Sequence, residues 1–315
     1  MKVLIWILVS HVLSEGRNSS IIVTFGDWGM DTNDFRMGTA RLGQVNAMTT
    51  ILLGDNFYDN GVKSVEDPLW ELFRDIRNTS DTFYAIVGNH DYIHSAQSQV
   101  SYSKTDPKWV MPALYYYNRI EITDQSGTYI CGVFLDSYKF DETQLRWVKL
   151  ILSSGVCQST NAYRMVFSHH PIHTVGIFQE SDIVKQLNAG LKPVLEEFKV
   201  HAFIAGHEHD MQVFYDNGVT YLISGAFSDK YSSNSQTAKD ATLLWRNVGT
   251  AGFLQLYPKT DQVGYDFIAS VSGESLFAGN INKSNNWTIE TLTQKDHLST
   301  SFMFQVCVII LSVLI

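Results

Sequence analysis

Short apolar runs recur along the middle of the chain, and helical patterns lie between several of them. Nine runs are rich in β-branched and aromatic residues and have the length of buried strands: residues 21–25, 49–53, 83–87, 129–135, 164–167, 202–205, 221–223, 253–257 and 265–270. Four segments repeat apolar residues at helical spacing: residues 39–48, 66–77, 143–152 and 182–198. This alternation predicts a layered α/β fold. Strands dominate after Tyr221, which favours a second, mostly antiparallel sheet packed on the first.

Both ends of the chain are hydrophobic. Residues 1–16 carry one lysine, an apolar run and then small residues, which is typical of a secretory signal peptide; a first core strand is the alternative. Residues 299–315 end in an apolar stretch shorter than the roughly 18–20 residues of a spanning helix. The polar spacer before it favours a lipid-anchor signal, with a short tail anchor or a buried element as alternatives. Between them, we expect one domain at residues 17–298.

Several features agree with the secretory pathway, with the protein at a cell surface or in an endomembrane lumen, joined to a membrane through its C-terminal tail. Cys131 and Cys157 are able to form a disulfide in such a compartment. Four sequons predict a glycoprotein, because an acceptor asparagine stands two residues before Ser or Thr: Asn18, Asn78, Asn282 and Asn286.

The composition of the chain excludes several classes of protein. Of the 315 residues 45% are hydrophobic, which provides a sizeable core and excludes wholesale disorder. The 23 basic residues against 32 acidic ones give a net charge of −9, which argues against binding to the nucleic-acid backbone. Three cysteines exclude a disulfide-rich scaffold and a CxxC zinc ribbon.

Five of the apolar runs end at a small residue that is followed by a potential metal ligand. Open α/β sheets place their sites at the carboxyl ends of strands, and a small residue there allows a tight turn. A single such motif is typical of an ordinary turn, but five of them predict a common site. The blocks are GDWG with Asp27, GDNFY with Asp55 and Tyr58, GNHD with Asn89 and His90, SHHP with His169, and GHEH with His207 and His209.

The mixture of ligand types predicts two different metal ions. Asp27, Tyr58 and a bridging Asp55 supply anionic oxygens, with His209 as a nitrogen ligand, and this set suits Fe(III). Asn89, His169 and His207 are neutral and share Asp55, which suits a divalent iron, zinc or manganese ion. Two ions about 3.5–4 Å apart stabilise in-line displacement at phosphorus and lower the pKa of a bound water.

Other phosphatase chemistries lack their motifs. Neither Cys131 nor Cys157 has an arginine at the spacing of a cysteine phosphatase, since Ser137 and Tyr163 stand there. The chain also has no RHG triplet, no GxSxG elbow and no GxxxxGK[ST] loop.

With these blocks in this order, the chain resembles the purple acid phosphatases, in particular the short, tartrate-resistant type, within the calcineurin-like metallophosphoesterases. The resemblance runs from about residue 21 to about residue 276. It implies a four-layer α-β-β-α sandwich of two mixed sheets flanked by helices. It also implies the ligand sets given above, with His90 as the catalytic residue, and an acid phosphatase that hydrolyses small phosphomonoesters by attack of a metal hydroxide.

The chain departs from the family pattern at two places, and two acidic residues beside the ligand motifs have predicted supporting roles. The chain runs from Asp136 into the next helix without the long loop of the mammalian enzymes. Residues 174–183 contain no histidine, so His173 or Glu180 is the candidate for the second acid group. Asp91 and Asp210, beside ligand motifs, are candidates for orienting the histidines.

Two other functions remain open at this stage. The chain resembles the glideosome-associated anchor proteins of apicomplexan parasites in residues 107–112 and in its hydrophobic end, which implies a membrane-anchored scaffold. However, that relative lacks several metal ligands that this chain keeps. The second alternative is a phosphodiesterase of the same superfamily, against which Tyr58 and the GDWG block argue.

Overall fold

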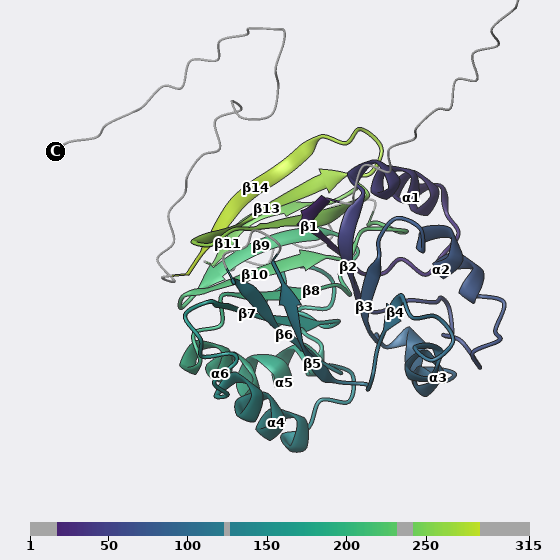
Figure 1. Cartoon of the computed structure of the whole chain (residues 1–315). Coiled ribbons are helices and arrows are strands. Elements are labelled where there is room, and N and C mark those ends of the chain that lie inside the picture. The colour runs from purple at the N-terminus through teal and green to yellow at the C-terminus, as the bar shows by residue number, and fades with distance from the viewer. Residues whose placement is uncertain (1–17, 123–126, 232–241, 284–315) are drawn as a thin grey trace, which may run out of the picture.

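Two seven-stranded sheets pack against each other in the computed structural model, which describes residues 18–122, 127–231 and 242–283 (Figure 1). The expected signal peptide, the C-terminal hydrophobic segment and Asn286 lie outside the described residues. None of the helices in the described part of the chain combines the length and hydrophobicity needed to cross a membrane.

The first sheet joins the N-terminal strands to the last three strands of the chain. Its order is β14-β13-β12-β1-β2-β3-β4, in which β1 to β4 are parallel and β12 to β14 antiparallel. The strands span Asn18–Phe25 (β1), Ala47–Leu53 (β2), Thr82–Ile86 (β3), Trp109–Val110 (β4), Gly252–Pro258 (β12), Gln262–Ala269 (β13) and Ser275–Asn282 (β14).

The second sheet is built from the middle of the chain. Its order is β11-β9-β10-β8-β7-β6-β5, with a parallel core of β6, β7, β8 and β10. The other three strands are antiparallel to their neighbours. The strands span Tyr116–Glu121 (β5), Tyr129–Phe134 (β6), Ala162–Ser168 (β7), Ala202–Ala205 (β8), Met211–Asp216 (β9), Val219–Ser224 (β10) and Leu243–Asn247 (β11).

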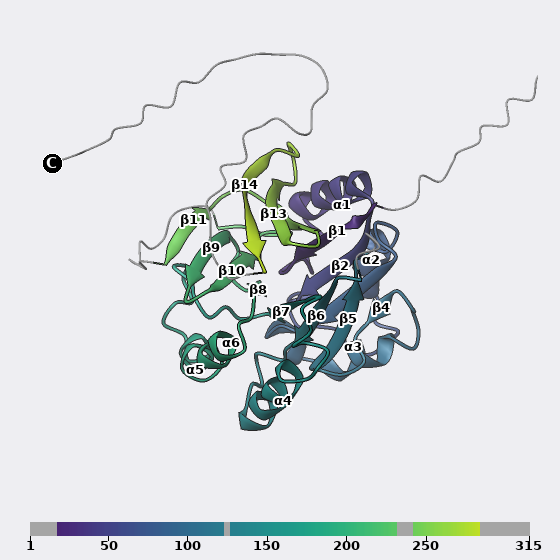
Figure 2. The same cartoon turned by 60° about the vertical axis from the view of Figure 1, so that its left-hand side comes forward.

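Helices lie outside both sheets and complete four layers. The 3₁₀ helix η1 (His90–Tyr92) follows β3, and the first sheet is flanked by α1 (Asn33–Val45), α2 (Trp70–Ile76) and α3 (Ala96–Tyr102). The second is flanked by α4 (Glu142–Leu152), α5 (Asp182–Gly190) and α6 (Lys192–Glu197). The view in Figure 2 shows the two helix groups beside different sheets. The predicted sandwich of two mixed sheets is therefore confirmed.

The core has two parts because the second sheet is buried on both faces. Strands β6, β8 and β10 are buried at every position, as expected for parallel strands covered on both sides. One hydrophobic cluster lies between the sheets and under α1 and α2. The other lies between the second sheet and α4 to α6, and it contains Cys131 and Cys157. These cysteines form a disulfide with a Cα–Cα distance of 5.4 Å, which realises the pairing that the sequence allowed.

Three expectations about the elements were wrong. Strands β12 to β14 extend the first sheet instead of forming a second one, because β12 pairs with β1. The helix expected at residues 182–198 is two helices, since Pro193 begins a new one after Leu191. The helix expected at residues 39–48 instead spans Asn33–Val45. It begins after Thr32, whose side chain caps it, and it ends before Asn46, which takes a left-handed conformation.

Candidate metal centre

The ligand-bearing turns follow parallel strands of both sheets and meet at the junction between them. Asp27, Asp55 and His207 stand after β1, β2 and β8, with φ angles of 58°, 49° and 69°. Non-glycine residues rarely adopt positive φ, and such conformations concentrate at functional sites. The turns direct three buried polar side chains to one place, and the other predicted residues join them there.

The first group contains the phenol, two carboxylates and one imidazole. The Tyr58 hydroxyl lies 2.9 Å from Oδ1 of Asp27 and 3.0 Å from Oδ2 of Asp55. Nε2 of His209 lies 3.2 Å from the same hydroxyl and 3.5 Å from Oδ1 of Asp27. These are the four residues that the sequence predicted for the trivalent ion, and the structure brings them together.

The second group contains the amide and two imidazoles, and Asp55 connects it to the first. Nε2 of His169 lies 3.1 Å from Oδ1 of Asn89, 3.2 Å from Nδ1 of His207 and 3.5 Å from Oδ2 of Asp55. All seven predicted ligands therefore lie in two adjoining groups. Within the described residues, the ligand atoms of Asp27, Asp55 and His169 lie within 4.8 Å of one another, close enough to hold one metal ion.

Glycines allow the carboxylates to approach the backbone closely. A Cβ added to Gly88 would lie 2.2 Å from Oδ1 of Asp55. A Cβ added to Gly206 or Gly225 would lie 2.7 Å from Oδ2 of Asp27. Side chains larger than hydrogen are therefore excluded beside both acidic ligands, which explains the glycines of the GNHD and GHEH blocks.

The electrostatics of the site suit a cation. Burial raises the pKa of the Asp55 carboxyl, and the charge of Asp27 acts in the same direction. Burial and both carboxylates raise the pKa of the Tyr58 phenol well above its usual range. Burial and the neighbouring imidazoles lower the pKa of His207 far below its ordinary value. Bound cations favour ionised acids and neutral imidazoles together, so these residues fit a metal centre.

The histidines are oriented by partners that the sequence analysis missed. Nδ1 of His169 lies 2.8 Å from the carbonyl oxygen of Leu53, and Nδ1 of His209 lies 3.1 Å from Oδ2 of Asp229. Such contacts leave Nε2 of each ring directed into the site. Burial opposes protonation of His209, but Asp27 and Asp229 outweigh it and raise its pKa to about 9.

The expected roles of Asp91 and Asp210 were wrong. The Asp91 carboxylate accepts hydrogen bonds from the backbone of Asn56 and Gly88 and from the Gln99 amide, so it orders the turns instead of a histidine. Asp210 accepts a hydrogen bond from the side chain of Gln212 and forms a buried ion pair with Arg246 at 2.7 Å.

His90 stands at the edge of the site. Its Nε2 lies 3.9 Å from Oδ2 of Asp55, its Nδ1 lies 2.6 Å from the carbonyl oxygen of Asp59, and its side chain is 34% exposed. The ring packs against Tyr58 with centroids 4.5 Å apart. This histidine is therefore oriented by the backbone and accessible to a ligand bound beside the carboxylates.

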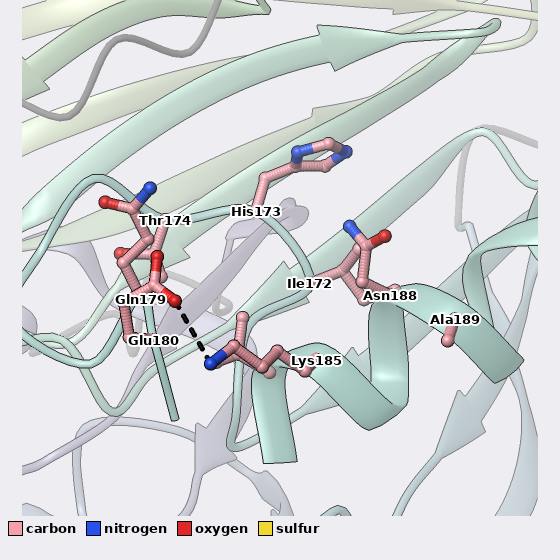
Figure 3. A pocket seen from close by; sticks show the side chains of 9 residues that line it. Ile172, His173, Thr174, Gln179, Glu180, Lys185, Asn188 and Ala189 are labelled. Atoms are coloured by element: carbon pink, nitrogen blue, oxygen red, sulfur yellow. Dashed lines mark ion pairs between the residues drawn. The ribbon is translucent and has the colours of Figure 1, made fainter. Parts of the chain in front are cut away.

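The remaining candidates for acid groups point elsewhere. Nε2 of His173 lies 3.3 Å from Oδ2 of Asp216, and Glu180 is ion-paired with Lys185 at 3.0 Å. Both line a pocket of about 300 Å³ between the loop after β7 and α5 (Figure 3). His170 is buried beside His207, and its Nδ1 lies 2.9 Å from the Ser137 hydroxyl.

Glu208, between the two histidines of the last block, holds the loop after β7. Its carboxylate accepts hydrogen bonds from the Thr174 hydroxyl at 2.8 Å and from the backbone N–H groups of Ile177 and Phe178 at 3.1 and 3.0 Å. The Phe178 ring then lies 4.2 Å from the His207 ring. Burial and the charge of Asp210 raise the pKa of Glu208 to about 6.

A family model for the calcineurin-like phosphoesterases matches residues 21–211, which include every predicted ligand from Asp27 to His209. The chain belongs to this family. The phosphoesterase is 28% identical over 307 residues to tartrate-resistant acid phosphatase type 5 of Oryctolagus cuniculus, which covers 84% of this chain and 91% of the relative. The resemblance to the purple acid phosphatases is thereby confirmed.

Solved structures share the fold of this phosphoesterase. GAP50, described as the anchor in the inner membrane complex of Plasmodium, superposes with a TM-score of 0.71 at 22% identity, covering 83% of this chain and 88% of GAP50. The purple acid phosphatase PPD1 from yellow lupin seeds gives 0.64 at 13% identity, covering 84% and 53%. At these identities the likeness establishes the architecture.

Proposed function

We propose that this phosphoesterase is a binuclear metal-dependent acid phosphatase that hydrolyses small phosphomonoesters. The observation that carries the proposal is the convergence of seven ligand-type residues in two groups that share Asp55. The ions, when bound, supply positive charge to the phosphoryl oxygens and lower the pKa of water for attack on phosphorus. The first group is assigned to Fe(III) and the second to a divalent ion, because their donors differ in charge.

The residues of the chain then have separate tasks. Asp55 belongs to both groups and fixes their spacing. His90, exposed and oriented through Asp59, is assigned to the phosphoryl oxygens and to protonation of the leaving alcohol. The Asp27 and His169 side chains are fully buried, and electrostatic interactions are stronger there than in water.

The alternative of a scaffold with a phosphatase fold has weaker support in this structure. The segment at residues 107–112, which resembles the anchor proteins, contributes β4 to the edge of the first sheet. Its Trp109 and Met111 are 1% and 0% exposed and belong to the larger hydrophobic cluster, where the Trp109 ring packs against Trp70 of α2 and Tyr102 of α3. Packing therefore accounts for these two side chains, and they offer no surface to a partner.

Metal content, visible absorption and hydrolysis of p-nitrophenyl phosphate between pH 4 and 8 test the proposal together. The protein loaded with iron should show a phenolate-to-Fe(III) band that Tyr58→Phe removes, while Tyr117→Phe on β5 keeps it. Asp55→Asn should lose metal, and His90→Ala should lose turnover by orders of magnitude while retaining metal.

The alternatives give different results in the same assays. A metal-free, inactive protein after iron loading would support the scaffold. Cleavage of bis(p-nitrophenyl) phosphate in preference to the monoester would support a phosphodiesterase. A colourless but active protein with two zinc or manganese ions would keep the hydrolase and remove the assignment of Fe(III).

The secretory route and the membrane link belong to the same proposal. Among the sequon residues, Asn78 is exposed, as a glycan acceptor must be, and Asn282 at the end of β14 is half-buried. Treatment of intact cells with a phosphatidylinositol-specific phospholipase should release the protein if its tail directs a glycolipid anchor. Full retention would favour a tail anchor, and a soluble protein without glycans would contradict the proposed location.

A further inference from the structure

Exposed apolar side chains stand on three segments that adjoin the second ligand group. Seven large hydrophobic residues are exposed in the described part of the chain, and three of them, Ile93, Tyr138 and Ile177, stand on segments that adjoin the metal centre; they are 58%, 37% and 43% exposed. Scattered exposed hydrophobics need no explanation, but their presence on three segments that adjoin one polar site is a reason to look for a binding surface there.

Ring contacts connect these segments to a predicted ligand. The Phe178 ring lies 4.2 Å from the His207 ring, and the His170 ring lies 4.3 Å from it. Tyr138 stacks on His170 at 6.1 Å, and Tyr92 packs on Tyr138 at 5.2 Å. We call Tyr92, Ile93, Tyr138, Ile177 and Phe178 the apolar rim.

The rim is held in place by buried polar groups. The Tyr92 hydroxyl donates to the Asp136 carboxylate, and the Ile93 N–H donates to the carbonyl oxygen of His90 at 3.2 Å. On the opposite segment, the buried Glu208 carboxylate fixes the backbone of Ile177 and Phe178. A preorganised apolar surface binds a ligand without the cost of ordering the side chains first.

The charge at the rim is slight. The ammonium of Lys139 lies 4.8 Å from the Tyr138 ring centroid and 5.6 Å from that of Tyr92, so it engages the faces of the same rings. The Asp136 carboxylate is buried and engaged by Tyr92. The rim residues themselves offer rings and aliphatic groups, and few of the hydrogen-bonding partners that a sugar requires.

We propose that the apolar rim binds the organic part of the substrate, and that this part is an aliphatic or aromatic group. The inference rests on the proposed phosphatase function for the position of the phosphoryl group at the metal centre. If His90 protonates the leaving alcohol, the ester oxygen lies beside His90, and its substituent is then near Tyr92 and Ile93 on the same segment and near Tyr138, which packs on Tyr92. Polar sugar phosphates gain little from such a surface.

A homologous series of n-alkyl phosphates, from methyl to hexyl, tests the inference on the metal-loaded protein. The alcohols leave with nearly equal intrinsic reactivity, so a trend in kcat/KM reports contact with the chain. Each methylene that becomes buried should raise kcat/KM by about fourfold. Tyr138→Ala and, independently, Ile177→Ser should flatten this trend, whereas Leu150→Ala, which removes an exposed hydrophobic from α4, should keep it.

Binding of n-alkyl phosphonates, measured by calorimetry, separates this inference from the proposed function. If the affinity rises with the length of the alkyl chain but the protein has no turnover, the inference about the apolar rim stands and the proposed phosphatase function is wrong. If turnover occurs but neither turnover nor affinity depends on the length of the alkyl chain, the inference about the apolar rim is wrong and the proposed phosphatase function stands. An equal slope in Ile177→Ser and in the unmodified protein would also overturn it.

Discussion

The backbone N–H of His207 donates a hydrogen bond of 2.7 Å to Oδ2 of Asp27, although 180 residues separate the two. Asp27 follows β1 of the first sheet, and His207 follows β8 of the second. The contact therefore joins the sheets at the metal centre, and the packing of one sheet on the other assembles both ligand groups. Substitutions at Asp27 should separate this structural role from metal binding.

We expect Asp27→Asn to lose metal without losing stability. The amide keeps an oxygen that can accept the His207 N–H, and it removes a negative charge beside Asp55. Asp27→Ala should lose metal as well, and it should destabilise the metal-free protein by about 1–3 kcal/mol because a buried N–H is left unpaired. Thermal unfolding of metal-free samples measures the difference. Equal melting temperatures for the two variants would remove the structural role of this contact.

Asp229 is expected to set the orientation of His209. Its Oδ2 lies 3.1 Å from Nδ1 of the ring, so Asp229→Asn weakens the contact that directs Nε2 inward. Loss of such partners typically costs about 10–100-fold in metal affinity. Competition with a chelator measures this affinity. Asp31→Asn is the matched control, because Asp31 is equally exposed at 54% and its carboxylate pairs with Arg36 instead of a histidine.

The sequence revealed the ligands more readily than their partners. Each ligand follows an apolar run and a small residue within a few positions, so local pattern suffices to find it. Asp229 and Glu208 act on residues 20 to 34 positions away, and nothing in their neighbourhood marks that contact. One signal was available for Asp229, because it stands five residues after β10, another parallel strand of the second sheet.

Local sequence pattern also located strands better than it assigned them to a sheet. Hydrophobic runs located most of the central strands, since parallel strands buried on both faces are continuously apolar. The assignment of β12 to the first sheet depends on pairing such as Ile22 with Leu256, which no local pattern encodes. The four edge strands β4, β5, β11 and β14 and the inner strand β9 were missed. Among them, β4 has only two residues, and β5 alternates buried and exposed positions only in part.

Gly88→Ala should damage the centre while the rest of the fold persists. The added Cβ would lie 2.2 Å from Oδ1 of Asp55 and 2.5 Å from its backbone nitrogen, so the shared carboxylate must move. We expect loss of at least one metal ion per chain, measured by elemental analysis. Gly155→Ala is the control, because no atom lies within 4 Å of its added Cβ. Full metal occupancy in Gly88→Ala would show that the turn adapts.

The disulfide should stabilise the second sheet and α4. Cys131 and Cys157 are 26 residues apart, and closing a loop of this length restricts the unfolded chain by about 3–4 kcal/mol. Replacement of both cysteines by alanine should lower the free energy of unfolding in urea by this amount. After treatment with a reductant, the unmodified protein should have a free energy of unfolding close to that of the variant. A shift below about 1 kcal/mol would indicate that strain in the folded protein offsets the restriction.

His201 is expected to make the protein less stable in acid. The ring is 2% exposed, and its Nδ1 accepts a hydrogen bond of 2.9 Å from the Arg164 backbone. Burial and the charge of Arg164 lower the pKa of His201 from 6.5 to about 3. Between these values the unfolded chain binds more protons than the folded one. Stability from this residue is complete above pH 6.5 and falls as the pH decreases toward 3, by up to about 1.4 kcal/mol per pH unit.

His201→Gln removes this titration and keeps a side-chain oxygen that can accept the Arg164 N–H. The variant should be less stable than the unmodified protein at pH 7, because the glutamine packs less well in the site of the ring. Its deficit should shrink by about 2–3 kcal/mol between pH 6.5 and pH 4.5, since only the unmodified protein loses the contribution of His201 there. Urea unfolding at both pH values measures the change. A deficit that is equal at the two pH values would mean that the pKa of His201 is the same in the folded and unfolded chains.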